Sequence, residues 1–314
     1  MNIAWYILLL AGGLVILWKA ADLLVRGAVG LAQHLGVSPL IIGLTIVAMG
    51  TSAPEVAASI AAVARGMGDT AIGNVYGSNI ANLALIGGVT ALIRPIKIER
   101  LTLRREIPVM LIVALFLWPV LHNLSLSRTE GIALLSVFAS LILLTVLMAR
   151  KRAIDAEQYT NYSSRATSKS LLFIAIGLAG LALGAEGAVR GAVVIGRQVG
   201  LSEAVIGLTI IAIGTSLPEL STCVVAAIKG HHDISIGNLV GSNIFNTLLV
   251  TGTAGVIWPF TIGPRLMKLD YWIMIIVSAG FAFIAIVGRR IISRAAGTLL
   301  LCGYLAYIIY RITI

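Results

Sequence analysis

Ten long apolar runs divide this chain of 314 residues and restrict the folds open to it. The runs cover approximately residues 3–33, 39–64, 70–93, 106–122, 128–149, 170–197, 203–228, 233–258, 269–288 and 295–312. Most reach the length of about 20 residues that an α-helix needs to cross a bilayer. Only 11% of the residues are charged, compared with about 25% in soluble proteins. The sequence therefore predicts an all-α integral membrane protein with ten transmembrane helices.

Two blocks of sequence occur twice at one spacing. Residues 43–55 read GLTIVAMGTSAPE and residues 207–219 read GLTIIAIGTSLPE, while IGNVYGSNI at 72–80 returns as IGNLVGSNI at 236–244. Both second copies follow at the same offset, without a gap, which is the offset that separates Glu55 from Glu219. This repeat offset also pairs Asp22 with Glu186, outside the blocks. One offset shared by motifs and charged residues indicates an internal duplication.

The duplication predicts an inverted topology. Each half has five spans, and an odd number makes the second half enter the membrane from the opposite side. We therefore expect two inverted five-helix repeats. The first, residues 1–150, carries the motifs at 43–55 and 72–82, and the second, residues 170–314, carries those at 207–219 and 236–246. Residues 151–169 are the predicted linker.

The basic residues predict the orientation. The net charge is +10, but no stretch combines basic residues with stacking aromatic residues, which argues against nucleic-acid binding. Loops after spans 3, 5, 7 and 9 hold fourteen Lys and Arg residues, and the opposite side holds five. Because cytoplasmic loops are enriched in Lys and Arg, the linker is predicted to be cytoplasmic and both termini outside.

The repeated GTSxPE motif lies in the middle of an apolar run. Pro54 lacks a backbone N–H and clashes with the carbonyl of Gly50, so the helix should loosen near Thr51. Irregular backbone at membrane depth is tolerated where it is buried or lines a polar cavity. Glu55 follows directly, and Glu219 ends the second copy. No Lys or Arg lies in the same helical segments, which leaves a bound cation as the expected partner of these costly buried charges.

The second motif, GSNIxN, supplies further oxygen atoms. Ser78 and Asn82 lie four residues apart on one helix face, as do Ser242 and Asn246. The Gly-Asn pairs that precede them add another amide in each half. Carboxylate, hydroxyl, amide and backbone carbonyl oxygens suit hard cations such as Na⁺ and Ca²⁺. They do not suit zinc or copper.

The duplicated motifs resemble the two α-repeats of the calcium/cation antiporter superfamily, specifically the sodium/calcium exchanger branch in its compact prokaryotic form. The resemblance covers nearly the whole chain. It implies a secondary active antiporter that exchanges Na⁺ for Ca²⁺ by alternating access in a prokaryotic inner membrane. It also implies partners limited to these ions and the lipid bilayer, with no enzymatic activity, cofactor or obligatory protein partner.

The resemblance further implies which residues bind the transported ions. Glu55 and Glu219 would be the principal Ca²⁺ ligands, together with backbone oxygens of Thr51 and Thr215. The remaining implied ion-site residues are Ala48, Ala212, Ser52, Ser216, Ser78, Ser242, Asn82 and Asn246. Potassium-dependent members carry an aspartate at the position of Asn246. The site charge of −2 in this chain therefore predicts potassium-independent, electrogenic exchange.

Three alternatives remain open from the sequence. A cation/proton antiporter of the same superfamily would share the fold and the acids, although the duplicated Ser, Thr and Asn residues favour Na⁺. An intramembrane enzyme would need catalytic or metal-binding groups within the spans, whereas every histidine falls in a predicted loop. A channel is disfavoured because inverted repeats with paired acids are typical of alternating access. Spans 1 and 6, which are long and partly polar, are the predicted sliding gate.

Overall fold

The computed structural model describes residues 3–155, 164–201, 206, 210 and 212–313, and almost all of them are helical. The helices of the first half are α1 (Ile3–Leu35), α2 (Pro39–Ile42), η1 (Gly43–Val47), α3 (Ala48–Thr51), α4 (Ala53–Ala64), α5 (Gly68–Ile80), η2 (Ala81–Ile86), α6 (Gly87–Ile93), η3 (Thr102–Glu106), α7 (Ile107–Leu121) and α8 (Arg128–Asp155). Those of the second half are α9 (Ser164–Gln198), α11 (Ala212–Thr215), α12 (Leu217–Ile228), α13 (His232–Phe245), η5 (Asn246–Val250), α14 (Thr251–Ile257), η6 (Leu266–Asp270), α15 (Tyr271–Val287) and α16 (Arg294–Thr313). Each η element is a π-helical turn.

These helices have the length and composition of membrane spans, which confirms the all-α prediction. Within the described residues, six continuous helices are long and apolar enough to cross a bilayer. Residues 39–51 and 53–64 form a seventh span if the bent pair is counted as one. Helices lie over all ten predicted runs, although part of the run 203–228 and residues 156–163 of the predicted linker lie outside the described residues.

The helices form a bundle with a buried centre and an apolar surface. Most residues of α5–α6 and α13–α14 are buried, whereas α8 is largely exposed. At the centre, Leu83 and Ile86 of η2 pack with Leu239 and Val240 of α13 and with Phe281 of α15. Exposed leucines along the outer helices are accounted for by lipid contact, since hydrocarbon is as apolar as their side chains.

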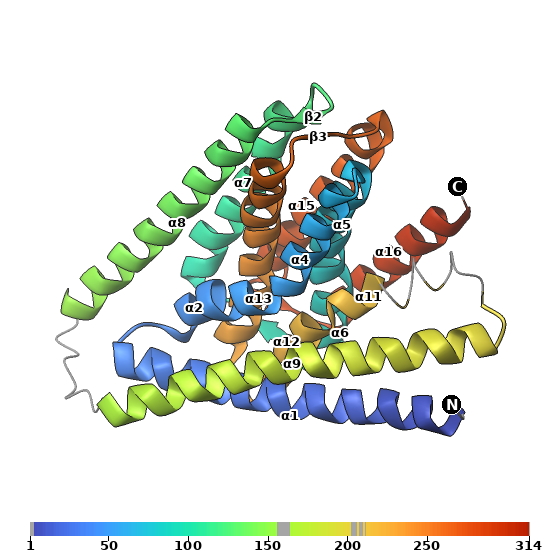
Figure 1. The fold of residues 1–314 in the computed structure, drawn as a ribbon. Coiled ribbons are helices and arrows are strands. Elements are labelled where there is room, and N and C mark those ends of the chain that lie inside the picture. Colours follow the sequence, from blue (N-terminus) through green and yellow to red (C-terminus); the bar gives the residue numbers. More distant parts are fainter. Residues whose placement is uncertain (1–2, 156–163, 202–205, 207–209, 211, 314) are drawn as a thin grey trace.

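Helices α1 and α9 form a separate antiparallel pair that lies across the rest of the bundle (Figure 1). Their backbones approach closely because small residues line the contact. A Cβ atom added to Gly13 would lie 2.5 Å from the backbone nitrogen of Ala188, and one added to Gly184 would lie 2.9 Å from that of Leu17. Small residues at such contacts allow the dense packing that holds membrane helices together.

Two short antiparallel ladders connect the halves of the chain. Strand β1 (Ile96–Lys97) pairs with β4 (Ile291–Ile292), and β2 (Ser125–Leu126) pairs with β3 (Phe260–Thr261). Each ladder joins a loop of the first half to a loop of the second. The β2–β3 ladder lies at the upper end of the bundle in Figure 1.

The α1–α9 contact predicts the effect of adding one methyl group. Gly13→Ala should lower the melting temperature of the purified protein by several degrees, because overpacking costs about 1–3 kcal/mol. Gly12→Ala is the matched control, since a Cβ atom at Gly12 has nothing within 4 Å. Thermal melting of both variants in one detergent tests this. Equal melting temperatures would contradict the packing described above.

Candidate ion-binding site

The GTSxPE motif interrupts a helix in each half. Helix α3 ends at Thr51, Ser52 has φ −84° and ψ 6°, and α4 begins at the next residue. The segments on either side are bent by 41°. In the second half Ser216 has φ −92° and ψ 6° between α11 and α12. The predicted interruption is therefore present at both sites, although residues 207–209 and 211 of the second block lie outside the described residues.

Most of the predicted ion-site residues are buried in the middle of the bundle. Thr215 is half-buried, and the side chain of Ala212 lies outside the described part of the chain. The buried members of the predicted set are Ala48, Thr51, Ser52, Glu55, Ser78, Asn82, Ser216, Glu219, Ser242 and Asn246.

Contacts between the halves bring these residues together. Ser52 Oγ donates a hydrogen bond to Glu219 Oε1 at 3.1 Å. Thr51 Oγ1 donates to Asn238 Oδ1 at 3.0 Å. Helix α4 packs against η5, which begins at Asn246, and α12 packs against η2, which contains Asn82. The helix that carries each glutamate thus adjoins the asparagine-bearing turn of the other half.

The same residues leave buried oxygen atoms without hydrogen-bond partners in the part of the chain that the structure describes. Buried polar groups are normally paired, so a cluster of unpaired acceptors requires an explanation. The unpaired acceptors in the predicted set are Glu55 Oε2, Glu219 Oε2, Asn82 Oδ1, Asn246 Oδ1, Ser216 Oγ and Ser242 Oγ. Oxygen ligands of this kind are those that hard cations prefer.

The described residues do not form a site suited to soft metals. No group of three or more His, Cys, Asp or Glu residues with metal-binding geometry occurs among them. Cys223 is fully buried, and its sulfur accepts a hydrogen bond from Asn238 Nδ2 at 3.3 Å. The thiol therefore has a structural contact to an asparagine beside the site.

Ser59 and Cys223 hold an asparagine beside each glutamate-bearing helix, a role that the sequence did not indicate. Asn74 Nδ2 donates to Glu55 O at 3.1 Å and to Ser59 Oγ at 3.0 Å. Cys223 is the repeat equivalent of Ser59, and it contacts Asn238, the repeat equivalent of Asn74. The repeat offset could have paired these two residues, but their contacts depend on how neighbouring helices pack.

A cavity of about 640 Å³ leads to the predicted ion-site residues from one side. Asn74, Ser78 and Thr215 line it together with Gly73 and Gly77. Among the described residues, a Cβ atom at either glycine would have nothing within 4 Å, so no described residue covers this face of α5. The charged residues that also line the cavity are Asp69, Arg265, Asp270 and Arg311.

The equivalent face of α13 is covered. A Cβ atom at Gly237 would lie 2.8 Å from the carbonyl oxygen of Leu40. One at Gly241 would lie 2.7 Å from that of Leu44. The segment before the first helix break is therefore packed backbone to backbone on α13. Within the described residues, access to the candidate site is thus open on the α5 side and closed on the α13 side.

This asymmetry predicts a difference in thiol reactivity between two equivalent serines. In a Cys302→Ser background, Ser78→Cys should react with a polar maleimide at least about tenfold faster than Ser242→Cys, because reactivity follows exposure. Ser78 lines the cavity, whereas Ser242 is fully buried. Labelling rates followed by mass spectrometry provide the measurement, and the background chain, with Cys223 buried, gives the blank. Equal rates would overturn the assignment of the open side.

Comparison with known proteins shows what this arrangement is similar to. The family model described as "Sodium/calcium exchanger protein" matches residues 5–147 and 169–313. The putative antiporter CaxA of Alkalimonas amylolytica is 40% identical over 94% of this chain and 95% of its own length. The inner membrane protein YrbG of Escherichia coli K12 is 38% identical over 96% of this chain and 94% of its own.

A solved structure has the same fold. The sodium-calcium exchanger NCX_Mj, soaked with Na⁺ and without Ca²⁺, superimposes with a TM-score of 0.85 at 30% identity. The match covers 98% of this chain and 99% of that protein. Sequence and structure comparisons therefore agree over essentially the full length.

Proposed function

Because this chain belongs to the sodium/calcium exchanger family of integral membrane transporters, we propose that it exchanges Na⁺ for Ca²⁺ by alternating access. The cluster of unpaired buried oxygens around Glu55 and Glu219 carries the proposal. These atoms need a cation partner, and either ion can supply the charge. Members of the family are transporters, so the two carboxylates are assigned to binding rather than to catalysis.

The proposed topology is ten spans in two inverted five-helix repeats, residues 1–150 and 170–314, joined by the linker 151–169. Matched elements support it, since both halves have a helix break before a glutamate and a π-helical turn at an asparagine. The ladders also correspond, because β3 is the repeat equivalent of β1 and each pairs with a strand of the other half.

We assign Ca²⁺ coordination to Glu55 and Glu219, with backbone oxygens of Thr51 and Thr215. The flanking Na⁺ positions are assigned to the other predicted residues. Support comes from the Ser52 contact to Glu219, which joins the two motifs directly. The neutral residues Asn82 and Asn246 complete the set, so the proposed site has a formal charge of −2.

That charge sets the coupling in the proposed mechanism. An ion-free pair of buried carboxylates carries a desolvation cost of several kcal/mol per charge, so the empty site should reorient slowly. One Ca²⁺ or two Na⁺ ions neutralise it. A third Na⁺ would leave net positive charge on the loaded carrier, which makes the exchange electrogenic. Without an aspartate at Asn246, there is no additional charge for K⁺ to neutralise.

The proposed orientation places the cavity on the outside of an inner membrane. Arg265 and Arg311, which line the cavity, belong to the side with few basic residues. Lys229, at the other end of α12, belongs to the basic side that is expected to be cytoplasmic. The relative YrbG is named as an inner membrane protein. In this proposal, the described part of the chain corresponds to an outward-open carrier.

The first test concerns the two glutamates. Glu55→Gln and Glu219→Gln should each abolish Na⁺-gradient-driven ⁴⁵Ca²⁺ uptake into proteoliposomes, because each removes half of the site charge. Glu99→Gln, at an exposed position, is the control and should keep the parent rate. Exchange that survives in both site variants would refute the proposal.

The second test concerns the coupling ion. An outward Na⁺ gradient should drive Ca²⁺ uptake equally with and without K⁺, and uptake should respond to membrane potential because net charge moves. A pH gradient alone should drive little uptake. Uptake driven by the pH gradient would instead favour the cation/proton antiporter, and a requirement for K⁺ would contradict the role given to Asn246.

A further inference from the structure

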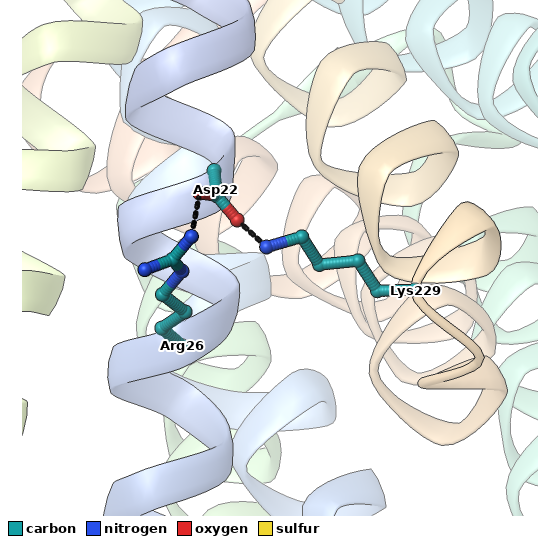
Figure 2. Close-up of polar contacts among 3 residues, drawn as sticks. All are labelled: Asp22, Arg26 and Lys229. Carbon is teal, nitrogen blue, oxygen red and sulfur yellow. Dashed lines mark hydrogen bonds and ion pairs between the residues drawn. The ribbon is translucent and has the colours of Figure 1, made fainter.

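An ionic contact links the α1–α9 pair to the helix that carries Glu219. Asp22 of α1 lies between Arg26 of the same helix and Lys229, the residue after α12 (Figure 2). Asp22 Oδ2 and Arg26 Nη2 are 2.7 Å apart, and Asp22 Oδ1 forms an ion pair with Lys229 Nζ. The Asp22 side chain is 19% exposed, so solvent screens this contact less than it screens a surface pair.

The contact coincides with a packed interface. Helix α1 packs against α12, the helix that begins just before Glu219. Lys229 is therefore at one end of a helix whose other end reaches the candidate ion site. A movement of α1 along this interface that exceeds the reach of the Lys229 side chain would separate Asp22 from Lys229.

The repeat places an equivalent set of charges in the other half. The repeat offset relates Asp22 to Glu186, Arg26 to Arg190 and Lys229 to Arg65. Glu186 pairs with Arg190, just as Asp22 pairs with Arg26.

The described residues do not form the Glu186–Arg65 contact that would be equivalent to Asp22–Lys229. Arg65, the residue after α4, is exposed and has no ion-pair partner among the described residues. Within the same residues, α9 does not pack along α4 in the way that α1 packs along α12. The two halves therefore have equivalent charges, but only one half has the contact between a long helix and an ion-site helix.

We propose that Asp22–Lys229 and Glu186–Arg65 are two alternating ionic latches, an inference that rests on the alternating access proposed above. The first latch holds the conformation in which the cavity beside α5 is open. The second forms when the α1–α9 pair shifts toward α4 and the site opens to the other side. Because α1 and α9 are packed backbone to backbone, they move as a unit, and the two latches exclude each other.

The latches shift the equilibrium between the two conformations of the carrier, but neither latch is strong enough to prevent the exchange between them. A partly exposed ion pair changes a two-state population only by about 2- to 5-fold. Ion binding at the two glutamates can overcome a bias of this size. The latches thus set the resting orientation of the carrier and influence its turnover, while the ions determine the direction of exchange.

The test uses a cysteine reporter in the cavity. Gly73→Cys in a Cys302→Ser background places a thiol on the open face of α5, where an added side chain has free space. The full chain in lipid nanodiscs is treated with a polar maleimide, and the labelling rate reports the open fraction. Asp22→Asn and Lys229→Gln should each slow labelling by about 2- to 5-fold. The double variant should be no slower than either single variant, because both remove the same contact.

Matched variants distinguish a latch from a structural contact. Arg26→Gln removes only the pair within α1 and should leave the labelling rate unchanged. Added to Asp22→Asn, either Glu186→Gln or Arg65→Gln should restore the rate toward that of the parent, whereas Arg190→Gln should not. Slowing by Arg26→Gln equal to that by Asp22→Asn would overturn the latch, as would failure of both Glu186→Gln and Arg65→Gln to restore the rate. If Asp22→Asn does not fold, Lys229→Gln replaces it in the same experiments, because it removes the same contact.

The reporter also separates this inference from the proposed function. Saturating Ca²⁺ should change the labelling rate of the parent reporter if the carrier alternates. A rate that does not respond to Ca²⁺ or Na⁺ would count against alternating access itself. A rate that responds to the ions but not to Asp22→Asn or Lys229→Gln would refute the latch alone.

Discussion

Two carboxylates that lie inside an apolar bundle, with no countercharge among the described residues, govern this structure. Glu55 and Glu219 are buried, and each has an oxygen to which no described residue donates a hydrogen bond. Removing such charges from water is costly unless they are paired. The helix breaks beside them, the adjoining asparagine turns and the hydroxyl of Ser52 all act to surround these charges with oxygen atoms. The rest of the bundle supplies the rigid apolar frame in which that arrangement persists.

The duplication solves the problem of access to such a site. In the proposed inverted topology, two nearly identical half-sites can be covered by equivalent segments from opposite sides. In the described conformation Gly237 and Gly241 lie under the segment from Leu40 to Leu44, whereas Gly73 and Gly77 line a cavity. Among the described residues, equivalent glycine faces therefore differ in whether a helix covers them. Within the described residues, a sequence with internal symmetry thus has an asymmetric arrangement, which is what a carrier requires if it opens to one side at a time.

The sequence predicted the parts of this structure that depend on local chemistry. The helix breaks beside Pro54 and Pro218 follow from the missing N–H of proline and from the neighbouring glycines. Acids in apolar runs stand out because burying a charge is costly. Ser59, Cys223 and Lys229 could not be assigned in this way, because their roles depend on which helices pack together. The open side could not be predicted either. Both halves carry the same glycines, so the sequence is compatible with closure on either face, and packing decides between them.

The two short ladders have a mechanical consequence. Each connects a loop of one half to a loop of the other, and in the proposed topology they lie at opposite faces of the membrane. Because the two halves are connected by a ladder at each end, they resist a hinge opening at one end, which would strain the strands of a ladder. The α1–α9 pair contributes no strand to either ladder. In the proposed alternating access, relative displacement would therefore be translation of this pair along a body that keeps its shape.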